Sequence, residues 1–251
     1  MSIESVVDWQ GLRRVGRLVD LTLRTLQANV RAGISTGELD QIAARFIAQH
    51  GGRSAPAMVY GFPGTVLISV NDEIVHGIPG DRRLEAGDVV KLDVTLEKGG
   101  YIADAARMVI VSGGSREAER LVACVEAAFD ASLGVARAGN RVSEIGRVIE
   151  NEVTRRGFSV VRGLTGHGVG RTIHEEPSVP NYYDPFQQEI LSEGLVLTIE
   201  PMISAGSSRA TEDENGWTIR TRDGSLAAHF EHTLVITRAR PVILTTTAQA
   251  A

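Results

Sequence analysis

The sequence predicts an α+β protein built from two copies of one unit, each with two helices followed by a β-hairpin. A glycine, an apolar run and an acidic residue at 87–93 recur at 194–200, an offset of 107 residues. Upstream, the segment 32–51 (AGISTGELDQIAARFIAQHG) matches 138–157 (AGNRVSEIGRVIENEVTRRG). This period is too long for a solenoid repeat. We therefore expect two copies packed about a pseudo-twofold axis.

The first copy begins with two predicted helices. Apolar residues at helical spacing predict a helix over 8–31. Ser35 followed by Glu38 is the pattern of a capping box, so a second helix is expected to begin there. Short apolar runs at 65–70 and 74–76 then predict strands.

Two β-rich runs joined by Lys98-Gly99 predict the first hairpin. If the turn centres on this dipeptide, Asp93 lies directly opposite Asp104, with Cβ atoms about 4.5–5.5 Å apart. Facing like charges are unfavourable, so the two carboxylates should repel or share a proton unless a cation binds them. The alternative is a pair of solvated aspartates on an exposed face.

The second copy repeats this plan. Helices are predicted over 115–137 and 141–156, and a second acidic pair, Glu200 and Glu231, corresponds to the two aspartates. Because Glu231 lies further along the chain than the repeat predicts, we expect an insertion in the second hairpin around 206–225.

Composition limits the class of protein. Hydrophobic residues make up 43% of 251 and charged residues 23%, which is ordinary for a globular protein. No apolar run approaches the ~20 residues that span a membrane, and a net charge of −5 disfavours nucleic-acid readout. A single cysteine, Cys124, and a start without signal-peptide features favour the cytoplasm. We expect one domain over 1–251 with a frayed tail at 245–251.

Three of the six histidines stand in unusual backbone. His76, His167 and His174 are flanked by glycine or proline, where a side chain is placed by the loop rather than by helix or strand packing. His167 and His174 are expected to line a loop over the carboxylates. Together with the two acidic pairs, His167 completes a predicted site for two divalent metal ions.

The other three histidines are predicted to be structural. His50 is explained as a residue at the end of its helix. His229 and His232 flank Glu231, and we expect both to face away from it.

Five motifs follow one another along the chain: SVNDEIVHGIPG, KLDVTLEKGGYIADAAR, TGHGVGRTIHEEP, LTIEP and FEHT. Together they resemble methionine aminopeptidases of the short bacterial type, over nearly the whole chain. The resemblance implies the pita-bread fold and removal of the N-terminal methionine from nascent polypeptides whose second residue is small. It also implies a monomer that docks transiently at the ribosome.

The resemblance implies a role for each metal ligand. Asp93 would bind one ion and His167 with Glu200 the other, while Asp104 and Glu231 would bridge the two. A metal pair lowers the pKa of a bridging water, so that hydroxide can attack the first peptide bond. A donor set with one nitrogen and no thiolate suits Mn(II), Fe(II) or Co(II), and Zn(II) is a further candidate.

The resemblance also implies the groups that act on the substrate. His76 and His174 would contact it near the scissile amide, with His174 stabilising the oxyanion. Glu200 would relay a proton to the leaving nitrogen.

The expected methionine pocket is apolar. Ile173 replaces an aromatic residue common in bacterial relatives, while Leu67 and Val59 stand where a cysteine and an aromatic residue are expected. These substitutions indicate either a changed pocket shape or repacking at conserved volume. The walls are assigned to Tyr60, Phe62, Leu67, Ile173 and Trp217.

Two other classes of protein share the expected fold. An Xaa-Pro-type peptidase usually carries a separate N-terminal domain, which we do not expect in this chain. A binding module of this fold typically loses metal ligands, whereas all five are present here.

Overall fold

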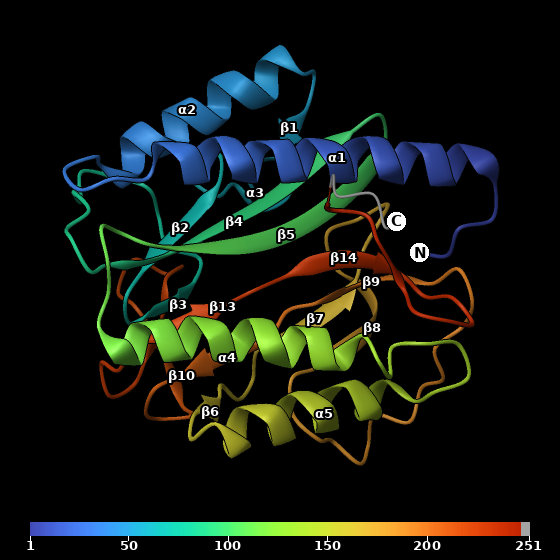
Figure 1. The fold of residues 1–251 in the computed structure, drawn as a ribbon. Coiled ribbons are helices and arrows are strands. Elements are labelled where there is room, and N and C mark those ends of the chain that lie inside the picture. The colour runs from blue at the N-terminus through green and yellow to red at the C-terminus, as the bar shows by residue number, and fades with distance from the viewer. Residues whose placement is uncertain (247–251) are drawn as a thin grey trace.

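The structure is a computed structural model and describes residues 1–246. Two layers of helices enclose the strands, with α1 and α2 on one side and α4 and α5 on the other (Figure 1). This arrangement confirms the α+β prediction. The helices are α1 (Val6–Asn29), α2 (Thr36–Gln49), α3 (Ala55–Tyr60), α4 (Arg116–Ser132) and α5 (Val142–Arg155).

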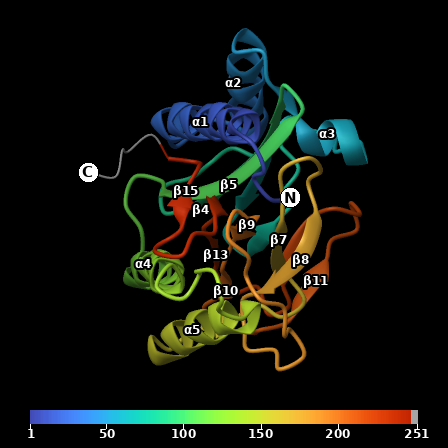
Figure 2. The ribbon, with the colours of Figure 1, turned by 90° about the vertical axis from the view of Figure 1, so that its right-hand side faces the viewer.

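The predicted start of α2 is confirmed in detail. The Glu38 backbone N–H donates to Ser35 Oγ at 3.0 Å, and the Ser35 N–H donates to the Glu38 carboxylate at 2.8 Å. This reciprocal pair satisfies two N–H groups that the first turn leaves without helical partners. Helix α2 follows α1 in sequence, and the short α3 comes next, at the edge of the molecule (Figure 2).

The first half contains a long hairpin. Strand β4 (Val89–Lys98) pairs with β5 (Tyr101–Ile110), and on its other edge with β1 (Arg53–Ser54) and β2 (Leu67–Val70). The next short strand is β3 (Glu73–Val75).

The predicted register of this hairpin is wrong. Asp93 lies opposite Ala106, and Asp104 lies opposite Thr95, so the aspartates share a face but are diagonal neighbours. The turn centres on Gly99 and Gly100, with φ of 63° and 82°. A two-residue hairpin turn of this kind needs positive φ at both central positions, which glycine adopts at no steric cost and Lys98 would not.

The second half contains a hairpin interrupted in the middle of both strands. Strand β9 pairs with β14, with Ile199 opposite His232, and β10 pairs with β13, with Met202 opposite His229. One register therefore runs through both pairs, and it sets Glu200 opposite Glu231. These strands are β9 (Val196–Ile199), β10 (Met202–Ser204), β13 (Ala227–His229) and β14 (His232–Val235).

The expected insertion in the second hairpin is confirmed. Between β10 and β13 the chain forms β11 (Ala210–Glu212) and β12 (Ile219–Thr221), and β12 pairs with β3 of the first half. The remaining strands are β6 (Ser159–Val160), β7 (Thr165–Gly168), β8 (Glu175–Pro180) and β15 (Val242–Ile243).

Each half has its own apolar core. One cluster joins α1 and α2 to β2, β4 and β5, and the other joins α4 and α5 to β9 and β14. Cys124 is buried in the second cluster. The duplicated plan of helices covering a hairpin is thus present in the structure.

The predicted frayed tail is only partly within the described residues. Thr245 is buried, and its hydroxyl lies 2.7 Å from His232 Nδ1, which contradicts fraying at this position. Residues 247–251 lie outside the described part. Within residues 1–246, no helix is both long enough and apolar enough to cross a membrane.

Candidate active site

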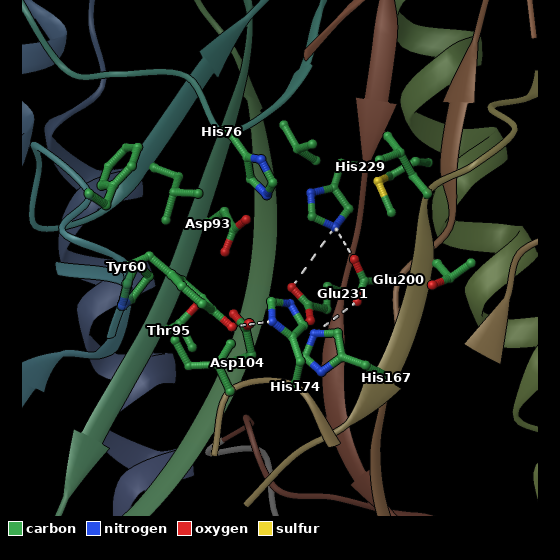
Figure 3. Close-up of a pocket in the computed structure, with 18 of the residues that line it drawn as sticks. Tyr60, His76, Asp93, Thr95, Asp104, His167, His174, Glu200, His229 and Glu231 are labelled. Carbon is green, nitrogen blue, oxygen red and sulfur yellow. Dashed lines mark hydrogen bonds and ion pairs between the residues drawn. The ribbon is translucent and has the colours of Figure 1, made fainter. Parts of the chain in front are cut away.

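A cavity of about 300 Å³ lies where the two hairpins meet, and it contains both acidic pairs (Figure 3). Asp93 and Asp104 project into it from β4 and β5, His167 from β7, and Glu200 and Glu231 from the interruptions of the second hairpin. The five residues predicted to bind metal are therefore brought to one cavity from both halves of the chain.

Burial raises the pKa of these carboxyl groups. The pKa of Asp104 rises to about 6. The pKa of Asp93, Glu200 and Glu231 is held well above its usual range, first by burial and then by the neighbouring carboxylates. Without a cation, these groups therefore retain protons at a pH where exposed carboxyl groups are ionised.

Several carboxylate oxygens in the cavity lack a partner. Asp93 Oδ1, Asp104 Oδ1 and Glu231 Oε1 are enclosed and have no hydrogen-bond partner among the described residues. Donor atoms of Asp104, His167 and Glu231 all lie within 4.8 Å of one another. Buried, unpaired oxygens beside a neutral imidazole fit a divalent cation, because coordination would satisfy them and remove their mutual repulsion.

The backbone around His167 orients its ring. The Nδ1 atom lies 2.9 Å from the Gly168 carbonyl, so Nδ1 carries the proton and Nε2, 3.4 Å from Glu200 Oε1, is free to bind a metal. Burial lowers the pKa of His167 to about 4, which keeps the ring neutral. A Cβ at Gly168 would lie 2.2 Å from the Glu176 carbonyl oxygen, so only glycine fits the close pairing of β7 with β8.

Thr198 fixes both His167 and Glu200. Its hydroxyl accepts a hydrogen bond from the His167 N–H at 3.0 Å and donates one to Glu200 Oε1 at 2.7 Å. Thr198 thus holds the backbone of His167 and the Oε1 atom of Glu200 in fixed positions relative to each other.

His174 is exposed, whereas His76 is half-buried. The Tyr60 hydroxyl is 2.6 Å from His174 Nδ1, and the His174 ring meets the His167 ring edge-on at 4.3 Å. His76 has a φ of 60°, an uncommon conformation for a residue with a side chain. Burial is the main cause that lowers the pKa of both His76 and His174.

Apolar residues form one side of the cavity. Phe62 and Trp217 meet edge-on, with ring centroids 5.2 Å apart, and Leu67 and Ile173 are buried. Tyr60 is half exposed at the mouth. All five predicted wall residues line the cavity: Tyr60, Phe62, Leu67, Ile173 and Trp217.

The expectation that His229 faces away from Glu231 is wrong. His229 lines the cavity, and its Nε2 lies 3.9 Å from Glu231 Oε2. Residues two apart in a strand share a face, and that alternation could have identified it from the sequence. Thr95 lines the cavity for the same reason, two residues after Asp93. His232 does face away, toward Thr245.

The comparison with protein families identifies the class of protein. Residues 10–238 match the model of metallopeptidase family M24. The chain belongs to this family, and it is therefore a hydrolase that uses divalent metal.

The similar proteins are methionine aminopeptidases. Methionine aminopeptidase 2 of Bacillus subtilis is 40% identical over 98% of this chain and 99% of its own length. The methionine aminopeptidase of Clostridium perfringens is 43% identical over 93% of this chain and 94% of its own length. The crystal structure of the Rickettsia prowazekii methionine aminopeptidase superposes with a TM-score of 0.94 at 35% identity, covering 98% and 100% of the two chains.

The fold is shared more widely. Prolidase from Pyrococcus furiosus has a TM-score of 0.79 at 20% identity, and this chain covers 66% of it. These relationships confirm the predicted pita-bread fold and the resemblance to methionine aminopeptidases, which the comparisons favour over an Xaa-Pro-type peptidase.

Proposed function

We propose that this chain removes the N-terminal methionine from nascent polypeptides whose second residue is small, and that it does so in the cytoplasm. The observation that supports this best is the cavity itself, where two acidic pairs and His167 lie beside an apolar wall. The apolar wall suits the thioether side chain of methionine. The carboxylate and imidazole groups beside it suit metal ions that would assist hydrolysis of the adjacent amide.

Five residues would hold two divalent ions. Asp93 would bind one, His167 and Glu200 the other, and Asp104 and Glu231 would bridge them. When bound, such a pair activates water and can anchor the free amine of the substrate. Mn(II), Fe(II) or Co(II) are the proposed metals, with Zn(II) as a further candidate, because the donors are mainly oxygen.

The protein's own groups would then position and protonate the substrate. Glu200, with one oxygen held by Thr198 and its pKa raised by burial, is suited to carry a proton to the leaving nitrogen. If the Tyr60 hydroxyl donates to His174 Nδ1, the neutral ring carries its proton on Nε2 and can donate it to the developing oxyanion. His76 is the second histidine expected to contact the substrate near this amide.

The same proposal covers the organisation of the molecule. We expect residues 1–251 to act as one catalytic domain and as a monomer. Transient docking at the ribosome stays a prediction of the family resemblance.

The test is hydrolysis of three peptides, Met-Ala-Ser, Leu-Ala-Ser and Ala-Pro-Ala. Protein freed of metal is reloaded with Mn(II), Fe(II), Co(II) or Zn(II) before each assay. We expect metal-dependent release of methionine from the first peptide and little cleavage of the others. Cleavage of the proline peptide would instead indicate an Xaa-Pro-type peptidase, and absence of cleavage with every metal would indicate a binding module.

A further inference from the structure

His229 is a buried histidine whose ring makes no hydrogen bond within the described part of the chain, and it stands in a cavity rich in metal donors. Its exposed fraction is 1%, and neither ring nitrogen has a hydrogen-bond partner among residues 1–246. Leaving a buried polar atom unpaired costs about 1–3 kcal/mol, so an unpaired imidazole at the wall of a cavity indicates a ligand that would satisfy it.

Both carboxylates of the second acidic pair lie close to His229. Its Nε2 lies 3.8 Å from Glu200 Oε2 and 3.9 Å from Glu231 Oε2, and in Figure 3 the ring points between these carboxylates. Both separations are too long for hydrogen bonds, which span about 2.7–3.2 Å.

The same separations suit two donors on one ion. Donors held at about 2.0–2.2 Å from a metal lie up to roughly 4.4 Å apart. His167, a proposed ligand, shows the comparable separation of 3.4 Å from Glu200 Oε1. Glu200 thus lies between two imidazole rings, with a different oxygen facing each ring.

We propose that His229 is a second imidazole ligand of the metal centre, on the side of Glu200 and Glu231. This inference rests on the proposed metal-dependent function and adds a nitrogen donor to it. Two imidazoles shift the metal preference of the site toward Co(II), Fe(II) or Zn(II) and away from Mn(II). Imidazole nitrogen suits the first three ions, whereas Mn(II) prefers oxygen donors.

His232 provides a matched control. It is also a buried histidine next to Glu231, but it faces the opposite side of the strand and its Nδ1 lies 2.7 Å from Thr245 Oγ1. Its ring packs against Phe129 and Phe230, so its surroundings already explain it.

The deciding experiment counts metal-bound imidazoles. In the ¹H NMR spectrum of Co(II)-loaded protein, each coordinated histidine gives a strongly shifted, exchangeable N–H signal. We expect one such signal from His167 and one from His229, with loss of the latter in His229→Gln and retention of both in His232→Gln. His229→Asn is the second variant if the first does not fold.

Calorimetric titration of metal-free protein supplies a second measurement. His229→Gln should lower Co(II) affinity by about 10-fold or more and Mn(II) affinity by less, while His232→Gln changes neither. A wild-type spectrum with the His167 signal alone, unchanged in His229→Gln, would overturn the inference and leave the proposed metal centre intact. Absence of every shifted signal would overturn both.

Discussion

The two halves of the molecule present the same chemistry from different backbones. In the first half, Asp93 and Asp104 stand within two unbroken strands as diagonal neighbours. In the second half, Glu200 and Glu231 face each other at a point where both strands are interrupted, next to Pro201, which cannot donate to a ladder. The longer glutamates bring their carboxylates to the cavity from an irregular backbone, whereas the shorter aspartates do so from a regular one.

The two halves therefore correspond in the roles expected of their carboxylates, but not in the positions of their backbone atoms. In the proposed metal centre, each half would supply one carboxylate that binds a single ion and one that bridges both ions. The predictions below test whether these roles are equivalent despite the unlike backbones.

The largest effect is expected from the two bridging positions. Asp104→Asn in the first half and Glu231→Gln in the second should each lower kcat/KM by about 1000-fold or more, roughly 4 kcal/mol, because the metal pair loses a shared anionic ligand. Metal content is measured by mass spectrometry and should fall in both. Glu193→Gln, at an exposed surface pair with Arg238, is the control. If only one variant loses metal, the halves are not equivalent.

The next effect concerns the stability of metal-free protein against pH. The pKa of Asp104 is about 6 in the folded protein and 3.8 as its ordinary value. Between these two pH values the folded protein therefore binds more protons than the unfolded protein. As pH rises from about 4 to 6, Asp104 lowers the free energy of unfolding by roughly 3 kcal/mol.

Urea unfolding at several pH values measures this contribution. Between pH 4 and 6, the stability of the metal-free wild type should fall relative to that of metal-free Asp104→Asn, because only the wild type loses the proton of Asp104. A pH dependence identical in the two metal-free proteins would contradict the proton binding assigned to Asp104.

A smaller effect is expected at His174, in the second half. His174→Ala should lower kcat by about 100-fold, since it removes the proposed oxyanion donor, while metal content stays near normal. Steady-state kinetics and metal analysis on the same sample check this. Loss of metal together with activity would show that the role proposed for His174 is wrong.

The smallest effect is expected at Tyr60. This residue of the first half orients His174 of the second half. Tyr60→Phe removes the 2.6 Å contact with His174 Nδ1, and a neutral hydrogen bond is worth about 0.5–1.5 kcal/mol. We expect kcat to fall by about 2–10-fold with little change in KM and an altered pH profile. Val59→Ala is the control, because Val59 is exposed on α3 and, contrary to its expected place in the methionine pocket, is not among the residues that line the cavity. A wild-type pH profile in Tyr60→Phe would rule out this coupling.

Much of the fold was predictable because its signals are local. The capping box at Ser35 and Glu38 depends on residues three positions apart, and the helices follow from apolar spacing within one segment. The repeat then predicted that both halves fold alike, and the displaced Glu231 predicted the insertion that became β11 and β12.

The sequence by itself determined which donors exist, their order along the chain and hence the class of chemistry. Only the tertiary structure decided the register of Asp93 against Asp104 and the approach of His229 to Glu200. The register depends on which two residues form the centre of the turn; Gly99 and Gly100 both have positive φ, and a shift of the turn by one residue moves every partner. Strand alternation places His229 on the face of Glu231, but its distance from Glu200 depends on the pairing of β10 with β13, which lie on either side of the β11–β12 insertion.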